Sequence, residues 1–192
     1  VTGTTQFIKQ KDLGARGTLV VEYETSTFTG TPKSASVIRE DGGFTYVETK
    51  VDPATGAIVT GTTQFIKQKD LGARGTLVVE YETSTFTGTP KSASVIREDG
   101  GFTYVETKVD PATGAIVTGT TQFIKQRDLG VRGTLVVEYN DSTFTGTPKS
   151  ASVIREDGGF TYVETKVDAV TGNAVTGTTQ FIKQKDLGAR GT

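Results

Sequence analysis

The stretch that decides the fold is SASVIREDGGFTYVETKV, which runs from Ser34 to Val51. Two runs rich in β-branched and aromatic residues flank the turn sequence Glu40-Asp41-Gly42-Gly43. Asp-Gly permits the positive φ angles of a tight hairpin turn. In the second run one side of a strand would carry Phe44, Tyr46, Glu48 and Lys50, and the other Thr45, Val47, Thr49 and Val51. The stretch therefore predicts an antiparallel pair of strands at 34–39 and 44–51.

Two further runs have the same character. One spans 18–23, with Leu19, Val21 and Tyr23 on one side, and could continue to Phe28. The other spans 57–67. Turn-forming residues separate the runs at 12–17, 30–33 and 52–56, and apolar residues at helical spacing are not sustained anywhere. Short links place consecutive strands side by side and antiparallel.

The whole pattern repeats along the chain. Val1–Ile58 recurs unchanged as Val59–Ile116 and, lightly edited, as Val117–Ala174, while 175–192 copies 1–18. Repeats of this length form arrays in which each unit mainly contacts its neighbours. We therefore expect an all-β fold of tandem 58-residue repeats. These would form a continuous antiparallel β-meander of about four strands per repeat, with repeats at 1–58, 59–116 and 117–174 and the start of a fourth at 175–192.

Composition narrows the classes of function. Among 192 residues there are 21 Lys and Arg, 22 Asp and Glu, and no His or Cys. The two signs of charge are interspersed, so the sequence predicts no nucleic-acid partner. No apolar run is long enough for a membrane helix, so no membrane insertion is expected within this segment. Without Cys there are no disulfides and no thiolate chemistry.

No single-copy catalytic constellation is visible, so we expect no enzyme and no catalytic residues. The absence of His and Cys removes most nucleophile–base arrangements. Ser26, Ser34 and Ser36 lie in Thr/Ser-rich segments and are expected to be surface or cross-strand residues. Glu22 and Glu24 would share a strand face, but a thin sheet offers no deep cleft for a carboxylate pair.

Metal, cofactor and anion sites are likewise not expected. Glu40, Asp41 and Asp52 carry oxygen ligands but lack the alternating carboxylates of a calcium loop. Arg16 lies between Gly14 and Gly17, but no helix begins there to complete an anion site. We therefore interpret all of these segments as turns.

In composition and architecture the chain resembles the tandem-repeat stalks of bacterial surface adhesins, which are Thr-rich, Cys-free, β-rich and nearly identical from copy to copy. Some such stalks carry Lys–Asn isopeptide or Thr–Gln ester cross-links. Asn occurs only at Asn140 and Asn173, which excludes a recurring isopeptide bond. Gln6 and Gln10 have threonines nearby, which leaves the ester open. Thr31-Pro32-Lys33 has the form of a proline-directed phosphosite, but a turn is the better interpretation.

Two functions remain as hypotheses. The first is an extracellular or cell-surface fibre or stalk that is extended by repeat number. The second is an intracellular, cytoskeletal protein that binds along a periodic polymer, one repeat per lattice unit. Partners in either case are adjacent repeats together with other copies of the chain or a repetitive polymer. A stalk should fold alone, whereas a lattice-binding chain should order only on its partner.

Overall fold

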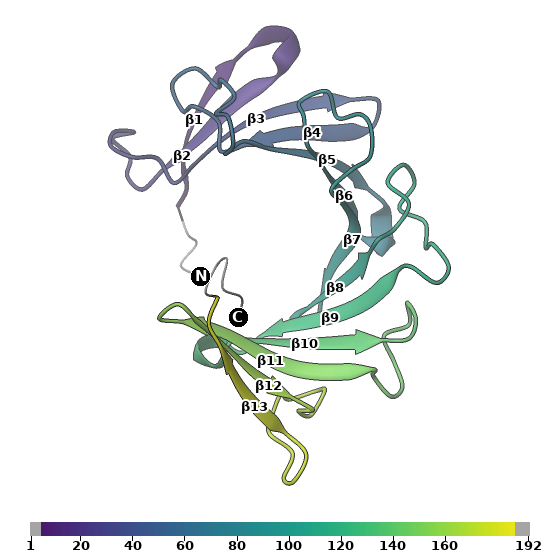
Figure 1. Cartoon of the computed structure of the whole chain (residues 1–192). Coiled ribbons are helices and arrows are strands. Elements are labelled where there is room, and N and C mark those ends of the chain that lie inside the picture. The colour runs from purple at the N-terminus through teal and green to yellow at the C-terminus, as the bar shows by residue number, and fades with distance from the viewer. Residues whose placement is uncertain (1–4, 187–192) are drawn as a thin grey trace. The chain divides into compact units, whose positions relative to one another are not determined.

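The computed structural model describes residues 5–186. Thirteen antiparallel strands follow one another in chain order through a single meander (Figure 1). Helical structure in the described residues is limited to three single 3-10 turns, at Gly14–Arg16, Gly72–Arg74 and Gly130–Arg132. The all-β meander expected from the sequence is therefore confirmed.

Each repeat supplies four strands in the same order. Those of the first are β1 (Phe7–Asp12), β2 (Thr18–Tyr23), β3 (Ser34–Asp41) and β4 (Phe44–Thr49). Those of the second are β5 (Gln64–Asp70), β6 (Thr76–Tyr81), β7 (Ser92–Asp99) and β8 (Phe102–Thr107). The third has β9 (Gln122–Asp128), β10 (Thr134–Tyr139), β11 (Ser150–Asp157) and β12 (Phe160–Thr165), and β13 (Gln180–Gln184) follows.

The described residues fall into two compact units, one of 5–93 with 111–113 and one of 94–110 with 114–186. The same local structure recurs within each. Two long connections are repeated: a phenylalanine loop after the second strand of each repeat (24–33, 82–91 and 140–149) and an aspartate loop after the fourth (50–63, 108–121 and 166–179).

Strand boundaries differ from the sequence expectation in all four runs, and the fourth run, which was expected to reach Val51, ends at Thr49. The run 57–67 is strand only from Gln64 onward, because 57–63 forms the second half of the aspartate loop. There, the N–H groups of Thr62 and Thr63 both donate to the carbonyl of Val59, each at 3.0 Å. The second run ends at Tyr23 rather than reaching Phe28, and the third continues to Asp41. The connections after the second and fourth strands are consequently longer than expected, whereas the turn between the third and fourth strands is shortened to Gly42-Gly43.

One face of the sheet carries the core, and we call it the core face. Leu19 and Val21 of β2 lie opposite Val37 and Ala35 of β3, and all four are buried. The alternate residues, such as Val20 and Ser36, are half-buried on the opposite, open face. This alternation is the period-two pattern of a strand with one covered face. In the third repeat the core residues are Phe123, Leu135, Val137, Tyr139, Phe144, Ala151, Val153 and Val167.

The aspartate loop covers this core. Lys50 has a φ angle of 56°, which ends the strand and reverses the alternation of side chains. Val51 therefore joins the core, although its spacing in the sequence predicts the side of Thr45 and Val47. Gly56 sits so close to the core that a Cβ atom would lie 2.8 Å from Leu13 Cδ1 and 3.1 Å from Val37 Cγ2. The loop thus forms a thin second layer over the sheet.

Candidate functional site

A strained phenylalanine marks each phenylalanine loop. The φ angles of Phe28, Phe86 and Phe144 are 53°, 52° and 52°. The left-handed region costs a non-glycine residue roughly 1–2 kcal/mol. Such a conformation persists only where surrounding contacts hold it. The three rings are therefore candidates for a specific role.

Phe86 joins two consecutive repeats. Its ring lies 5.0 Å from that of Tyr46 on β4 of the preceding repeat, measured between centroids. It also lies 6.1 Å from Phe65 and 6.2 Å from Tyr81 of its own repeat. All three contacts are edge-to-face, the favoured geometry for aromatic pairs. We call these four residues the junction cluster, and Tyr104, Phe123, Tyr139 and Phe144 form the same cluster in the other unit.

Exposure shows what the phenylalanine loop of the same repeat contributes to the first-strand phenylalanine that it covers. Phe65 and Phe123 are 8% and 7% exposed. These two equivalent positions match, as the sequence predicts for the interior of an array. Phe181 occupies the same position on β13, where no such loop lies over it within the described residues, and it is 71% exposed. Phe28 has only Phe7 and Tyr23 as ring contacts and is 39% exposed.

A buried carboxylate lies beside the junction cluster. Glu48 projects from the core face of β4, and Arg16 Nη2, from the 3-10 turn, donates to its Oε2 atom at 2.5 Å. A buried carboxylate without such a partner would be costly. In the third repeat Arg132 Nη2 is 3.6 Å from Glu164 and donates to the Gly172 carbonyl at 2.7 Å. Arg132 Nη1 donates to Oδ1 of Asn173, a residue that is alanine in the other copies.

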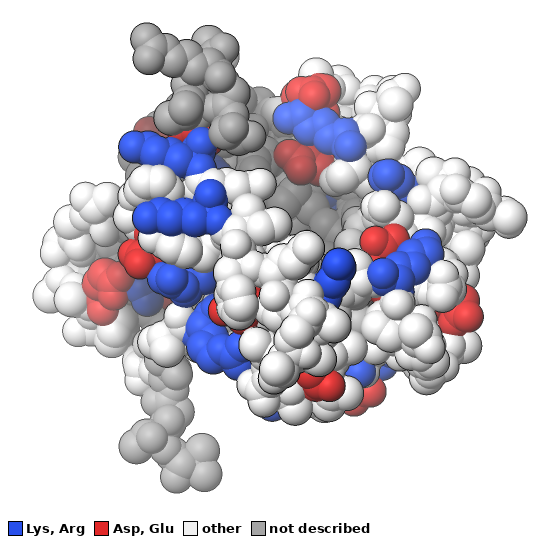
Figure 2. All heavy atoms as spheres, turned by 60° about the horizontal axis from the view of Figure 1, so that its bottom comes forward, with Lys and Arg blue, Asp and Glu red and all other residues white. Residues whose placement is uncertain are grey.

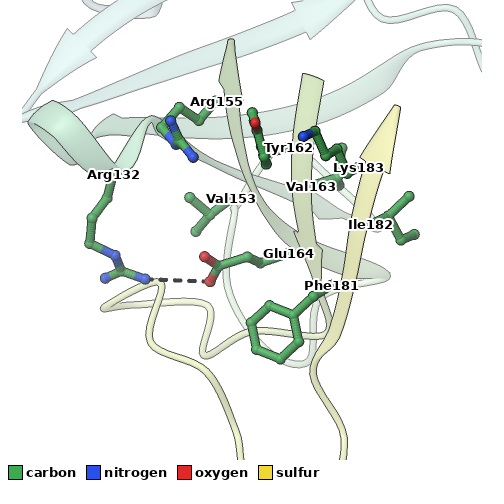
Figure 3. Close-up of a pocket in the computed structure, with 9 residues that line it drawn as sticks. All are labelled: Arg132, Val153, Arg155, Tyr162, Val163, Glu164, Phe181, Ile182 and Lys183. Atoms are coloured by element: carbon green, nitrogen blue, oxygen red, sulfur yellow. Dashed lines mark ion pairs between the residues drawn. The ribbon is translucent and has the colours of Figure 1, made fainter. Parts of the chain in front are cut away.

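A pocket of about 400 Å³ adjoins this ion pair, and we call it the junction pocket. The pocket is lined by residues of the first repeat and of the phenylalanine loop of the second. They include Arg16, Arg39, Tyr46, Glu48, Ser84 and Phe86. Its counterpart in the third repeat measures about 180 Å³. Figure 3 shows Arg155, Tyr162 and Lys183 together at one end of that pocket, Phe181 at the other end, and Glu164 between them.

The residues considered as catalytic candidates do not converge. Ser26 is exposed in the phenylalanine loop, and Ser34 and Ser36 lie on the open face of β3. Glu22 and Glu24 both lie near Lys33 Nζ, at 3.9 and 3.6 Å, and so form a surface ion-pair group. Thr31 is exposed beside this group.

The candidate oxygen ligands also have separate roles. Glu40 accepts a hydrogen bond from Thr45, and Asp41 pairs with Arg39. Asp52 Oδ1 accepts bonds from the Thr55 hydroxyl and from the N–H groups of Thr55 and Ala54. These bonds, the Thr55 hydroxyl first, lower the pKa of Asp52 below its ordinary value. Across residues 5–186 no three acidic side chains are grouped as a metal site.

The candidate anion-binding groups of the glycine-rich turn have partners within the chain. The Gly14 N–H donates to Asp12 Oδ1, and Arg16 turns to Glu48. The threonine–glutamine pairing considered for an ester is seen on the open face as a hydrogen bond. Thr49 Oγ1 donates to Oε1 of Gln64, the counterpart of Gln6, at 3.2 Å, and equivalent bonds join Thr107 to Gln122 and Thr165 to Gln180.

Sequence reasoning missed the central residue of the site. Phe28 was interpreted as a possible end of the second strand, whereas the structure turns it and its counterparts back over the core. The signal was available: one large apolar residue lies in an otherwise polar segment, Glu24-Thr25-Ser26-Thr27-Phe28-Thr29-Gly30. An isolated aromatic residue between turn-forming residues favours an anchor over an extended strand.

No protein-family model, curated protein or solved structure matches the chain. Within the described part of the chain, none of the helical elements is long or apolar enough to cross a membrane. What can be said of function therefore rests on the junction itself.

Proposed function

We propose that this chain is a non-enzymatic structural array, an extracellular or cell-surface fibre or stalk whose length is set by repeat number. The observation that carries the proposal is the junction cluster, in which Phe86 packs on Tyr46 of the preceding repeat. Each repeat buries part of its aromatic surface only when the next repeat follows. Arrays with such nearest-neighbour interfaces gain stability as repeats are added.

Composition supports the same function. Cys and Met are absent, so the chain offers no side chain of the kind most readily oxidised outside a cell. The core of each repeat comes largely from its own strands and loops. This favours a chain that folds alone over one that borrows the surface of a polymer partner.

The test compares the intact chain with forms that carry one or two additional copies of 59–116 inserted at 116/117. We expect the intact chain to give a β-type circular dichroism spectrum and to resist proteolysis. The midpoint of denaturation should rise with each insertion, and the maximum dimension from small-angle X-ray scattering should grow by a constant increment. An intact chain that is unfolded alone and becomes ordered only on a filament would contradict the stalk and support the lattice-binding alternative.

A further inference from the structure

The cations of each repeat are not equally neutralised. Lys33 and Arg39 pair with carboxylates. Lys67 and Lys69 instead lie over aromatic rings. Lys67 Nζ is 4.0 Å from the Phe44 ring centroid and 5.6 Å from that of Tyr46, and Lys69 Nζ is 5.1 Å from Phe44. Cation–π contacts hold a cation in place without cancelling its charge.

The strand register brings these groups together. Tyr46 lies opposite Arg39 on one neighbouring strand and Lys67 on the other. Arg39 packs on the Tyr46 ring with its Cζ atom 4.3 Å from the centroid. Three cations and one carboxylate, Asp41, thus surround the two rings. We call Arg39, Asp41, Phe44, Tyr46, Lys67 and Lys69 the basic–aromatic cluster.

The same cluster recurs along the chain. In the third repeat Lys183 Nζ is 4.0 Å from the Phe160 centroid and Arg155 Cζ is 4.3 Å from that of Tyr162. Between them lies a copy in which Lys125 and Arg127 flank Phe102. In Figure 2 several Lys and Arg side chains lie next to one another in short rows, with Asp and Glu beside some of them. The sequence, nearly neutral overall, gives no indication of this local excess.

The cluster opens into a concave site. Arg39 and Tyr46 belong both to it and to the junction pocket, where Arg16, Glu48 and Ser84 supply further polar groups. In the third repeat Arg155, Tyr162 and Lys183 all line the pocket, together with Arg132 (Figure 3). Concave sites with a few convergent polar groups and an aromatic wall are typical of ligand sites.

We propose that the junction pocket and the basic–aromatic cluster bind an acidic polysaccharide, with one acidic sugar unit taken up per repeat. The excess of cations in the basic–aromatic cluster favours a negatively charged ligand. Lys67 lies over the Phe44 ring and Arg39 over the Tyr46 ring, which competes with the stacking of nucleobases on these rings that single-stranded nucleic acid uses. Hydroxyl groups of a sugar fit the remaining donors and acceptors at Arg16, Glu48 and Ser84.

Repetition makes such a site useful even if each copy is weak. Several sites on one chain that engage one polymer raise the overall affinity by about 10²–10⁴ over a single site. We therefore expect the intact chain to bind polygalacturonate at least about a hundredfold more tightly than galacturonic acid monomer. A neutral dextran should not bind.

The experiment titrates fluorescently labelled polygalacturonate with the intact chain and two matched triple variants. The first carries Lys67→Gln, Lys125→Gln and Lys183→Gln. The second carries Lys33→Gln, Lys91→Gln and Lys149→Gln, which removes equal charge from lysines that pair with Glu22, Glu80 and Glu138. We expect the first to weaken binding about tenfold or more, about 1.4 kcal/mol, and the second less than about twofold. Lysine-to-arginine changes at the first three positions should retain binding.

Three outcomes would overturn the proposal. An equal loss of affinity for polygalacturonate in both triple variants, with unchanged circular dichroism, would mean that diffuse electrostatic attraction holds the polymer. Single-stranded or duplex DNA that binds as tightly as the polysaccharide would mean a general polyanion surface. No binding to polygalacturonate at low ionic strength would mean that the cluster is structural only.

Discussion

The ring of Phe86 stands edge-on against that of Tyr46, with centroids 5.0 Å apart and planes inclined at 76°, although the two residues belong to different repeats. Phe86 holds this position at the cost of a positive φ angle. The contacts that surround this strained residue therefore come partly from its own repeat, at Phe65 and Tyr81, and partly from the preceding one, at Tyr46.

Phe86→Ala should consequently destabilise the chain far more than Phe28→Ala. The two residues have identical sequence surroundings, and both lose the same side chain at a positive φ angle. Of the two, only Phe86 contacts a tyrosine of the preceding repeat and is buried. We expect losses of about 3 kcal/mol for Phe86→Ala and about 1 kcal/mol for Phe28→Ala, measured by urea denaturation. Equal losses would mean that the phenylalanine loop acts only within its own repeat.

The turn after the first strand contains a second matched pair. Gly14 and Gly17 both have positive φ angles, of 66° and 109°. A Cβ atom on Gly17 would lie 2.3 Å from the Ile38 carbonyl oxygen, whereas a Cβ atom on Gly14 would have no neighbouring atom within 4 Å. We expect Gly14→Ala to cost about 1 kcal/mol, the price of the left-handed conformation. Gly17→Ala should cost at least about 3 kcal/mol, because backbone atoms must move. Thermal unfolding of the two variants provides the comparison. A loss of stability for Gly17→Ala that is no larger than that for Gly14→Ala would mean that β3 moves to accommodate the added Cβ atom.

Lys50, Lys108 and Lys166 end their strands with φ angles of 56°, 57° and 56°. Glycine would relieve roughly 1–2 kcal/mol of strain at each position but loses roughly 0.5–1 kcal/mol more conformational entropy on folding, so replacing all three lysines should stabilise the chain by roughly 1.5–3 kcal/mol in total. The midpoint of thermal unfolding should rise by roughly 3–12 °C. Alanine at the same positions removes the lysine side chains but keeps the backbone strain, and it should give no gain. If alanine stabilises as much as glycine, side-chain charge rather than backbone strain is the cause.

The aspartate loop should weaken in acid. The Thr55 hydroxyl, followed by the N–H groups of Thr55 and Ala54, lowers the pKa of Asp52 below its ordinary value, and Thr171 does the same for the pKa of Asp168. A carboxyl group whose pKa is lower when folded adds stability above its unfolded pKa, and that stability is lost as the pH falls through the folded pKa. We therefore expect the free energy of unfolding to decrease as the pH drops below about 4.

Replacing Thr55, Thr113 and Thr171 with valine should raise the pKa of Asp52 and Asp168 and reduce this loss of stability in acid. The readouts are carboxyl chemical shifts and urea denaturation across the acidic range. Thr31→Val, at an exposed threonine of the phenylalanine loop, is the control and should leave the acid response unchanged. If the loss of stability in acid is unchanged in the triple variant, other carboxyl groups are its cause.

The sequence by itself determined the period, the approximate positions of the strands and the alternation of side chains along the second and fourth strands of each repeat. Identical copies imply an array, the Asp-Gly turn implies a hairpin, and alternation at Leu19 and Val21 implies one covered face, because a strand turns successive side chains to opposite faces. These are local relationships between residues close in the chain.

Only tertiary structure decided what covers that face. Lys50 and Phe28 adopt left-handed backbone conformations that no local preference favours. They do so because Val51 then reaches the core, and because the Phe28 ring then packs edge-on against Phe7 and Tyr23. Likewise, the cations at Arg39 and Lys67 are interspersed in the sequence and gather around Tyr46 only because strand pairing places residues from three strands in one row.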